Sequence, residues 1–333
     1  MVIIYCEKSI GWSPVAYMVK LAVHLFDAEL VMLEYRGASL GEKLSTLFLK
    51  RKNRQGEKLL IVCPSPTELS LIFQEYDFRS RFDCITAWVF DSFWVDRIPW
   101  FVKKTGLFDH FFITSREDVE EWEKLTNTPT TWIPWGADVL GLGGVEASRK
   151  WDLVRVGRQP KDWDDDDVTQ GLCRKNNICF GGRPDFFEDA IQNQKAMMSV
   201  YQQAKFILAF SNIANPESYT HPTREYLTAR WVDALACGSV VAGISPQEAS
   251  ISELLWDGAT LELGTVNATE GMAIISEALS VWTQKQADYN YYQSLKYLDW
   301  RWRFMDIANL LELSPKKLLL EVEQLNFKIT NAD

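Results

Sequence analysis

Short apolar runs alternate with helical segments along the whole chain, and this alternation restricts the fold more than any other feature. Val2 to Cys6 is an uninterrupted apolar run, Val15 to Phe26 has helical periodicity, and Glu29 to Glu34 is a second strand-like run. Strands that are apolar at every position are typical of parallel sheets covered by helices on both faces. The order strand, helix, strand is that of a βαβ unit. The sequence therefore predicts an α/β fold.

The length of 333 residues predicts two domains, because a single core rarely grows beyond about 250–300 residues. A glycine-containing segment, Val139 to Arg149, separates two halves that each contain strands and helices, and it is predicted to be a linker. We expect an N-terminal domain over 1–140, a second domain over 150–298 and C-terminal helices over 299–333. Further strands are predicted at 58–63, 84–90, 109–114, 131–134, 153–158, 177–182, 205–211 and 239–243.

The formal net charge of −10 argues against a general nucleic-acid or anionic-membrane surface. One basic cluster departs from this balance: Lys50, Arg51, Lys52 and Arg54, followed by Lys58. Two interpretations stay open for it, a solvated loop or a binding surface for a negatively charged acceptor. Nucleic acid is expected as a partner only if a modified nucleic acid is the acceptor.

The six cysteines form no CxxC pair, and four of them lie in apolar runs or beside a predicted core helix. This usage predicts buried thiols in a reducing compartment, without structural disulfides or zinc. Met1 leads directly into a strand, and no apolar run approaches the length of a transmembrane helix. We expect a cytoplasmic protein without a transmembrane segment, and peripheral membrane contact stays open.

The stretch from Thr223 to Gly243 has the most specific pattern in the chain. It is predicted to be a helix, ended by Gly238, that runs into a buried strand. Glu225 and Asp233 are separated by seven residues, which in a helix places them about two turns apart. Two such carboxylates could hold hydroxyl groups at both ends of one ligand, while the helix N-terminus attracts an anion between them. A diphosphate flanked by two sugars fits this arrangement. The alternative is an amphipathic helix with two solvated acids.

Glu225, the seven residues after it, and Asp233 with the following Ala-Leu-Ala-Cys-Gly resemble the E-x7-E motif of GT-B glycosyltransferases of the GT4 type (glycosyl transferases group 1). The second acid is Asp here in place of Glu. Other segments are similar to motifs of the same family in the same order: Ile133-Pro-Trp-Gly-Ala-Asp138, Val156-Gly-Arg158, and Glu253-Leu-Leu-Trp-Asp-Gly258.

The resemblance implies a GT-B architecture, in which two Rossmann-like domains face each other across a cleft and a C-terminal helix crosses back to the first domain. It implies transfer of a hexosyl group from a nucleotide-diphosphate sugar to an acceptor hydroxyl, with retention of configuration and without a metal or other cofactor. The alternatives are a catalytically inactive nucleotide-sugar-binding protein and a GT-B epimerase or phosphorylase. The sequence names neither the donor nor the acceptor.

The resemblance also implies roles for particular residues. Arg158 and Lys161 would stabilise the departing diphosphate, Glu225 would bind the donor sugar, and Asp233 would bind the ribose, with both carboxylates ionised. Asp91, at the end of a predicted central strand, would orient the acceptor or handle a proton; its alternative is an N-cap. The catalytic candidates are thus Asp91, Arg158 and Glu225. The remaining donor-side candidates are Gly11, Gly182, Arg183, Thr223 and Tyr226.

The acidic run Asp164 to Asp167 invites comparison with a metal-binding DxD motif. We interpret it instead as a solvated helix start, because four adjacent acids point in different directions and repel one another. No metal site is predicted.

Overall fold

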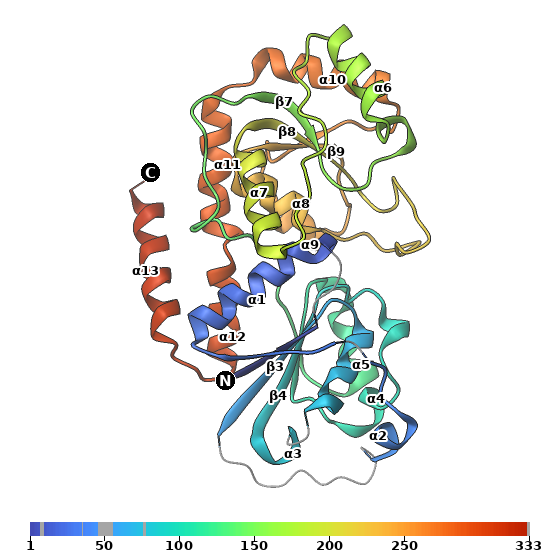
Figure 1. The fold of residues 1–333 in the computed structure, drawn as a ribbon, viewed down its shortest axis with the longest axis vertical. Coiled ribbons are helices and arrows are strands. Elements are labelled where there is room, and N and C mark those ends of the chain that lie inside the picture. The colour runs from blue at the N-terminus through green and yellow to red at the C-terminus, as the bar shows by residue number, and fades with distance from the viewer. Residues whose placement is uncertain (7–9, 35, 46–55, 76–77, 332–333) are drawn as a thin grey trace. The chain divides into compact units, whose positions relative to one another are not determined.

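The computed structural model describes residues 1–6, 10–34, 36–45, 56–75 and 78–331. The chain forms two compact units (Figure 1). The first comprises Met1–Pro134 and Arg303–Val322, and the second comprises Trp135–Trp302 and Glu323–Asp333. The predicted linker Val139 to Arg149 therefore lies within the second unit. The basic residues Lys50 to Arg54 lie outside the described residues, so the structure tests neither interpretation of that cluster.

The first unit is built on a parallel sheet with the strand order β2-β1-β3-β4-β5-β6. Val2 pairs with Glu29 on one side and with Leu59 on the other, so the direction of strand addition reverses at β1. In open parallel sheets, ligand sites lie beyond the carboxyl ends of the strands at such a reversal. The strands are β1 (Val2–Tyr5), β2 (Glu29–Met32), β3 (Glu57–Cys63), β4 (Phe82–Val89), β5 (His110–Ile113) and β6 (Thr130–Trp132).

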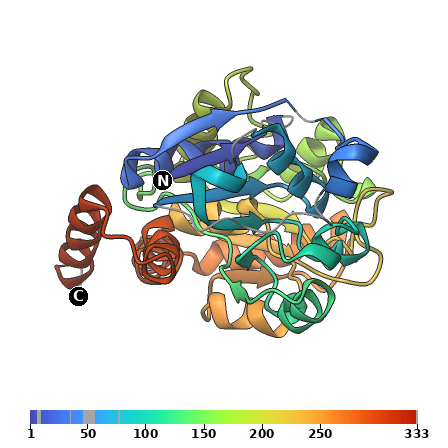
Figure 2. The ribbon, with the colours of Figure 1, turned by 90° about the horizontal axis from the view of Figure 1, so that it is seen from below.

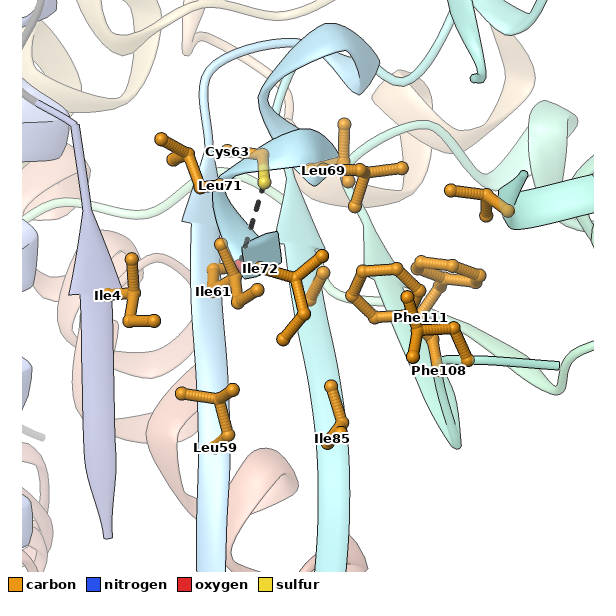
Figure 3. Close-up of a cluster of buried hydrophobic side chains, with 14 of the residues drawn as sticks. Ile4, Leu59, Ile61, Cys63, Leu69, Leu71, Ile72, Ile85, Phe108 and Phe111 are labelled. Atoms are coloured by element: carbon orange, nitrogen blue, oxygen red, sulfur yellow. Dashed lines mark hydrogen bonds between the residues drawn. The ribbon is translucent and has the colours of Figure 1, made fainter. Parts of the chain in front are cut away.

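Helices cover both faces of this sheet. On one face Phe304 packs against Phe26 and Trp88, with ring centroids 5.9 and 6.4 Å away, which places α1 and α12 together. The other face carries the larger apolar cluster in Figure 3, where Ile61 and Ile85 from neighbouring strands meet Leu69 and Ile72 from the segment after β3. The helices of this unit are α1 (Ser13–Phe26), α2 (Leu40–Ser45), α3 (Phe78–Arg81), α4 (Val102–Thr105), α5 (Val119–Thr126) and most of α12 (Trp300–Leu310).

The second unit has a smaller parallel sheet with the order β10-β9-β8-β7. Its strands are β7 (Trp151–Arg155), β8 (Ala204–Phe210), β9 (Val240–Ile244) and β10 (Thr260–Glu262). The strand predicted at 177–182 is wrong: only Phe180 forms an isolated bridge, to Leu153. Asn177 and Gly182, at the ends of that segment, have φ of 57° and 69°, and this left-handed backbone interrupts an extended strand.

Two groups of helices enclose the second sheet. Leu153, Leu208 and Ala242 pack with side chains of α6 and α10 in one buried cluster, and these two helices lie together in Figure 1. The contacts of α8 with α7 and α11 form the other layer. The helices are α6 (Asp166–Lys175), α7 (Ala190–Gln202), α8 (Ala229–Ala236), α9 (Ala249–Leu254), α10 (Ala268–Val281) and α11 (Gln284–Tyr297).

A buried charge cluster joins the start of the second unit to its segment 299–301. Arg301 donates to Asp138 at 2.7 Å and to Asp299 at 3.0 Å, and these three residues are at most 4% exposed. Asp299 also accepts the backbone N–H of Leu140 at 2.8 Å. The turn that contains Asp138 and the first turn of α12 are therefore held as one piece.

The last helix, α13 (Lys316–Thr330), follows α12 and carries the C-terminus in Figures 1 and 2. Leu318 and Leu325 are buried, whereas Leu320 and Phe327 are exposed. Among the described residues, no helix is both long enough and apolar enough to cross a membrane.

Candidate functional site

The candidate donor site lies at the carboxyl edge of the second sheet. Arg158 follows β7, Asn212 follows β8 and Gln247 follows β9. Because these strands are adjacent and parallel, their following loops meet at one edge of the sheet. Most of the predicted donor-side residues lie in or near these loops.

Arg158 lies on a tight turn that directs its side chain over this edge. Gly157 has φ of +68°, a left-handed conformation that favours glycine, and the turn follows β7 immediately. The Arg158 guanidinium lies over the ring of Tyr219, with 5.4 Å from Cζ to the ring centroid. Its Nη1 is buried and has no hydrogen-bond partner within the part of the chain that the structure describes.

Asn212 fixes the loop that leads to α8. Its Nδ2 donates to the carbonyl oxygens of His221 and Arg224, at 2.9 and 2.7 Å. The Nδ1 of His221 accepts the backbone N–H of Arg224 at 3.0 Å. Glu225 follows directly, and its Oε2 accepts the backbone N–H of Gln247 at 2.7 Å. This contact holds the Glu225 carboxylate beside the loop after β9. Of its neighbours, Thr223 is exposed and Tyr226 is half-buried.

The prediction that Glu225 and Asp233 share one helix is wrong. Helix α8 begins at Ala229, and its N-cap Thr228 is extended, with φ −126° and ψ 167°. A helix from Thr223 would need the carbonyls of residues such as Arg224 as acceptors for its own N–H groups, but Asn212 occupies the Arg224 carbonyl. Glu225 therefore lies in an irregular segment four residues before the helix.

Asp233 faces the interior of the second unit. Its side chain is 3% exposed, and its Oδ2 accepts a hydrogen bond from Nε2 of Gln194 on α7 at 2.9 Å. Burial raises the pKa of Asp233 to about 7, although the Gln194 hydrogen bond lowers it. The prediction that neighbouring cations favour an ionised Asp233 is therefore wrong for this residue, since no cation lowers its pKa.

The other predicted donor-side residues of this unit are dispersed around the same edge. Lys161 is exposed and begins a 3₁₀ turn, Lys161–Trp163. Gly182 has φ of +69°, and its carbonyl accepts the backbone N–H of Arg155 at 3.1 Å. Arg183 forms an ion pair with Asp164 at 3.1 Å, so its guanidinium is partly engaged.

The acidic run Asp164 to Asp167 is occupied by protein partners. Asp165 caps α6 by accepting the N–H groups of Asp167 and Val168 at 2.9 and 3.0 Å. The buried Arg155 pairs with Asp164 at 3.0 Å and also with Asp166. Within the described ranges, no three His, Cys, Asp or Glu side chains form a metal-binding group.

Gly11 and Asp91 belong to the first unit. Gly11 lies in the 3₁₀ turn Ile10–Trp12, directly before α1, and Asp91 follows β4. The Asp91 N–H donates to the carbonyl of Pro64 at 2.9 Å, and its carbonyl accepts the N–H of Trp94 at 3.3 Å. Both residues therefore lie at the carboxyl edge of the first sheet, where strands β1 and β4 are separated by β3.

Sequence reasoning missed a set of buried polar atoms in the loops that follow β7 and β8. Five atoms in these loops are buried without a hydrogen-bond partner among the described residues, and such atoms are rare in folded proteins unless a ligand or water completes them. They are Arg158 Nη1, Gln159 Oε1, Asn212 Oδ1, Asn215 Nδ2 and Thr228 Oγ1. Two asparagines in the loop after the largely apolar strand β8, Asn212 and Asn215, were the available sign in the sequence.

Comparison with known proteins identifies the fold. The chain is similar to solved structures of Anabaena Alr3699/HepE in complex with UDP (12% identity, TM-score 0.54, 93% of this chain and 99% of that chain) and with UDP-glucose (12% identity, TM-score 0.54, 94% and 99%). The pneumococcal O-GlcNAc transferase GtfA is less similar (12% identity, TM-score 0.48), and the alignment spans 76% of this chain and 56% of GtfA. The sequence matches no protein-family model and no curated protein. The predicted α/β class and GT-B fold, with two Rossmann-like units, are confirmed.

Proposed function

We propose that this chain is a GT4-like glycosyltransferase that moves a hexosyl group from a nucleotide-diphosphate sugar to an acceptor hydroxyl. The fold supports this proposal, because a solved protein of similar fold, Anabaena Alr3699/HepE, binds UDP and UDP-glucose. At this level of identity the fold alone does not determine the reaction, so the residues of the site must carry the proposal.

One observation carries it: a buried, unpartnered guanidinium nitrogen at the carboxyl edge of a parallel sheet. Arg158 pairs with no carboxylate within the described part of the chain, and its Nη1 is left without an acceptor. A buried cationic nitrogen without an acceptor is costly, and the cost is removed when an anion binds it. The diphosphate of a nucleotide sugar supplies that charge, and the charge grows on the leaving group as the glycosidic bond breaks.

The proposed roles follow from the positions of the side chains. Arg158, with Lys161, stabilises the leaving diphosphate, and Glu225 accepts hydrogen bonds from hydroxyls of the transferred sugar. Asp91 orients the acceptor or receives its proton. Asp233 binds the ribose only if its side chain leaves Gln194, which now holds it in the interior. The remaining proposed donor contacts are Gly11, Gly182, Arg183, Thr223 and Tyr226.

The reaction is proposed to retain the anomeric configuration and to need no metal or other cofactor, with cationic side chains neutralising the diphosphate. A reducing, cytoplasmic setting is proposed as well. It is supported by six free cysteines, of which Cys6, Cys63, Cys173 and Cys237 are buried. The acceptor is an unidentified compound with a free hydroxyl group.

A nucleotide-sugar panel tests the proposal. UDP-, GDP-, ADP- and dTDP-linked hexoses are added to the purified protein, and the melting temperature is measured. A donor at 100 times its Kd should stabilise the protein by about 2.7 kcal/mol. The donor found is then assayed for release of nucleoside diphosphate, alone and with candidate acceptors, with and without a chelator. Stabilisation without any turnover would indicate an inactive binding protein. A panel without any stabilising member would refute the proposal.

A further inference from the structure

Arg230, in the first turn of α8, contacts the turn that contains Arg158. Its Nη1 donates to the carbonyl oxygens of both Val156 and Arg158, each at 3.0 Å. A Cβ added to Gly157 would lie 3.4 Å from the Cδ and Nη1 of Arg230, so the side chain is in close contact with all three residues of the turn. The family resemblance gives no role to this position.

These two hydrogen bonds link the Arg158 turn to the start of α8. The Val156 carbonyl also accepts from Nε2 of Gln159, at 3.1 Å, which adds a third contact within the same turn. A guanidinium that donates from one nitrogen to two carbonyls restricts the backbone on both sides of Gly157. The direction in which the Arg158 side chain leaves the sheet is set by that backbone.

Arg230 also places a second positive charge beside Arg158. The pKa of Arg230 is lowered chiefly by burial, and the charge of Arg158 lowers it further, so the two cations are within electrostatic range. Neither forms an ion pair with a carboxylate in the described ranges of the chain. Like charges held together in a partly buried site repel unless an anion lies between or beside them.

We infer that Arg230 is a positioning residue of the donor site: it holds the Val156–Arg158 turn so that the Arg158 guanidinium faces the diphosphate. This inference rests on the proposed function, because it concerns the same anion. Arg230 acts through Arg158, so it should matter for nucleotide binding only while Arg158 is present.

A double-mutant cycle on nucleotide affinity tests this inference. The Kd values of UDP, GDP, ADP and dTDP are measured by calorimetry for the wild type, and the tightest binder is then used for Arg158→Ala, Arg230→Met and the double variant. Arg230→Met should weaken binding about tenfold in the wild-type background and less than about threefold in the Arg158→Ala background. Arg174→Met, on an exposed part of α6, is the matched control and should bind as the wild type does.

The half-buried position of Arg230, and its two hydrogen bonds to the backbone, require a second variant. Arg230→Lys keeps the positive charge but replaces the planar guanidinium by a single ammonium group. The Lys variant should therefore fold even if Arg230→Met fails to fold. The Lys variant should also weaken binding, by less than the Met variant, and should raise KM for the donor more than it lowers kcat. A merely structural role would lower the melting temperature and reduce affinity equally in both backgrounds.

The outcomes separate this inference from the proposed function. Weaker binding by Arg158→Ala together with unchanged binding by both Arg230 variants would overturn the inference and leave the proposed site in place. Equal losses for Arg230→Met with and without Arg158 would also overturn it. If the wild type binds none of the four nucleotides, or binds equally well after Arg158→Ala, both the proposed site and the role of Arg230 fall.

Discussion

The buried carboxyl of Asp233 makes the stability of the second unit depend on pH in a predictable direction. Burial raises its pKa from 3.8 to about 7, so between these two values the folded state holds a proton that the unfolded state has released. Where the folded state binds more protons, the free energy of unfolding falls as pH rises. The stabilising contribution of the protonated form is therefore lost progressively up to about pH 7.

The size of the effect follows from the same shift. One pKa unit corresponds to about 1.4 kcal/mol, and over the interval from pH 5 to pH 8 the linkage relation gives a loss of roughly 2 to 3 kcal/mol. Asp233→Asn removes the titration but keeps an oxygen that can accept the hydrogen bond from Gln194. The variant should therefore be more stable than the wild type at pH 8, and this advantage should shrink toward pH 5.

Melting curves at pH 5, 6, 7 and 8 provide the assay. For a unit of this size 1 kcal/mol corresponds to about 2–4 °C, so the difference in Tm between variant and wild type should grow by roughly 5–10 °C over this range. Asp185→Asn makes the same chemical change at an exposed position and serves as the control. Parallel pH profiles for Asp233→Asn and the wild type would refute the reasoning.

Three further substitutions have definite expected outcomes. Glu225→Gln should leave the melting temperature within about 1 °C, because the side-chain oxygen of Gln can accept the same N–H of Gln247. The variant should lower kcat at least tenfold in a turnover assay, and an unchanged kcat would remove Glu225 from the site. Arg149→Met should lower the free energy of unfolding by about 3 kcal/mol in urea titrations, and a loss below about 1 kcal/mol would contradict this. The reason is that Arg149 donates to the carbonyl of Cys237 at 2.7 Å and to the hydroxyl of Ser239 at 3.2 Å. Gly243→Ala should prevent native folding, as judged by circular dichroism, because its Cβ would lie 1.6 Å from the carbonyl oxygen of Ala209 on β8; a native spectrum would show that the two strands can separate.

The strands were predictable where burial makes most positions apolar. Val2 to Cys6, the strand before Asp91 and the strand before Asn212 are of this kind, and the structure confirms each of them within one or two residues. The segment 177–182 contains a short apolar run, Ile178–Phe180, but left-handed residues at both of its ends limit it to one bridge. Local backbone conformation of this kind is not visible in an apolar pattern.

The candidate site was only partly predictable for a related reason. Arg158 was identified from the Val156-Gly-Arg158 motif, and the structure places it in the turn directly after β7. The helix start could not be identified, since the competing hydrogen bonds to the carbonyls of His221 and Arg224 come from the side chain of Asn212, 9 and 12 residues earlier, and helical periodicity does not show such contacts. The same limit applies to Arg230, whose contacts with Val156 and Arg158 span more than 70 residues.

The pKa of Asp233 shows how tertiary packing changes the expected chemistry of a motif. The spacing between Glu225 and Asp233 matches the family pattern, yet one acid lies in a loop and the other is buried against Gln194. The shorter Asp side chain reaches one methylene less far than Glu, and here its carboxyl lies next to α7. A motif therefore fixes the positions of two residues in the chain without fixing their ionisation.

The position of a bound nucleotide tests the account most directly. Crystals of the wild-type protein grown with the tightest-binding nucleoside diphosphate should show the diphosphate within about 3.2 Å of Arg158 Nη1, at the carboxyl edge of β7 and β8. A nucleotide bound elsewhere, such as in the hollow beside Tyr289 and Tyr292 on α11, would contradict it.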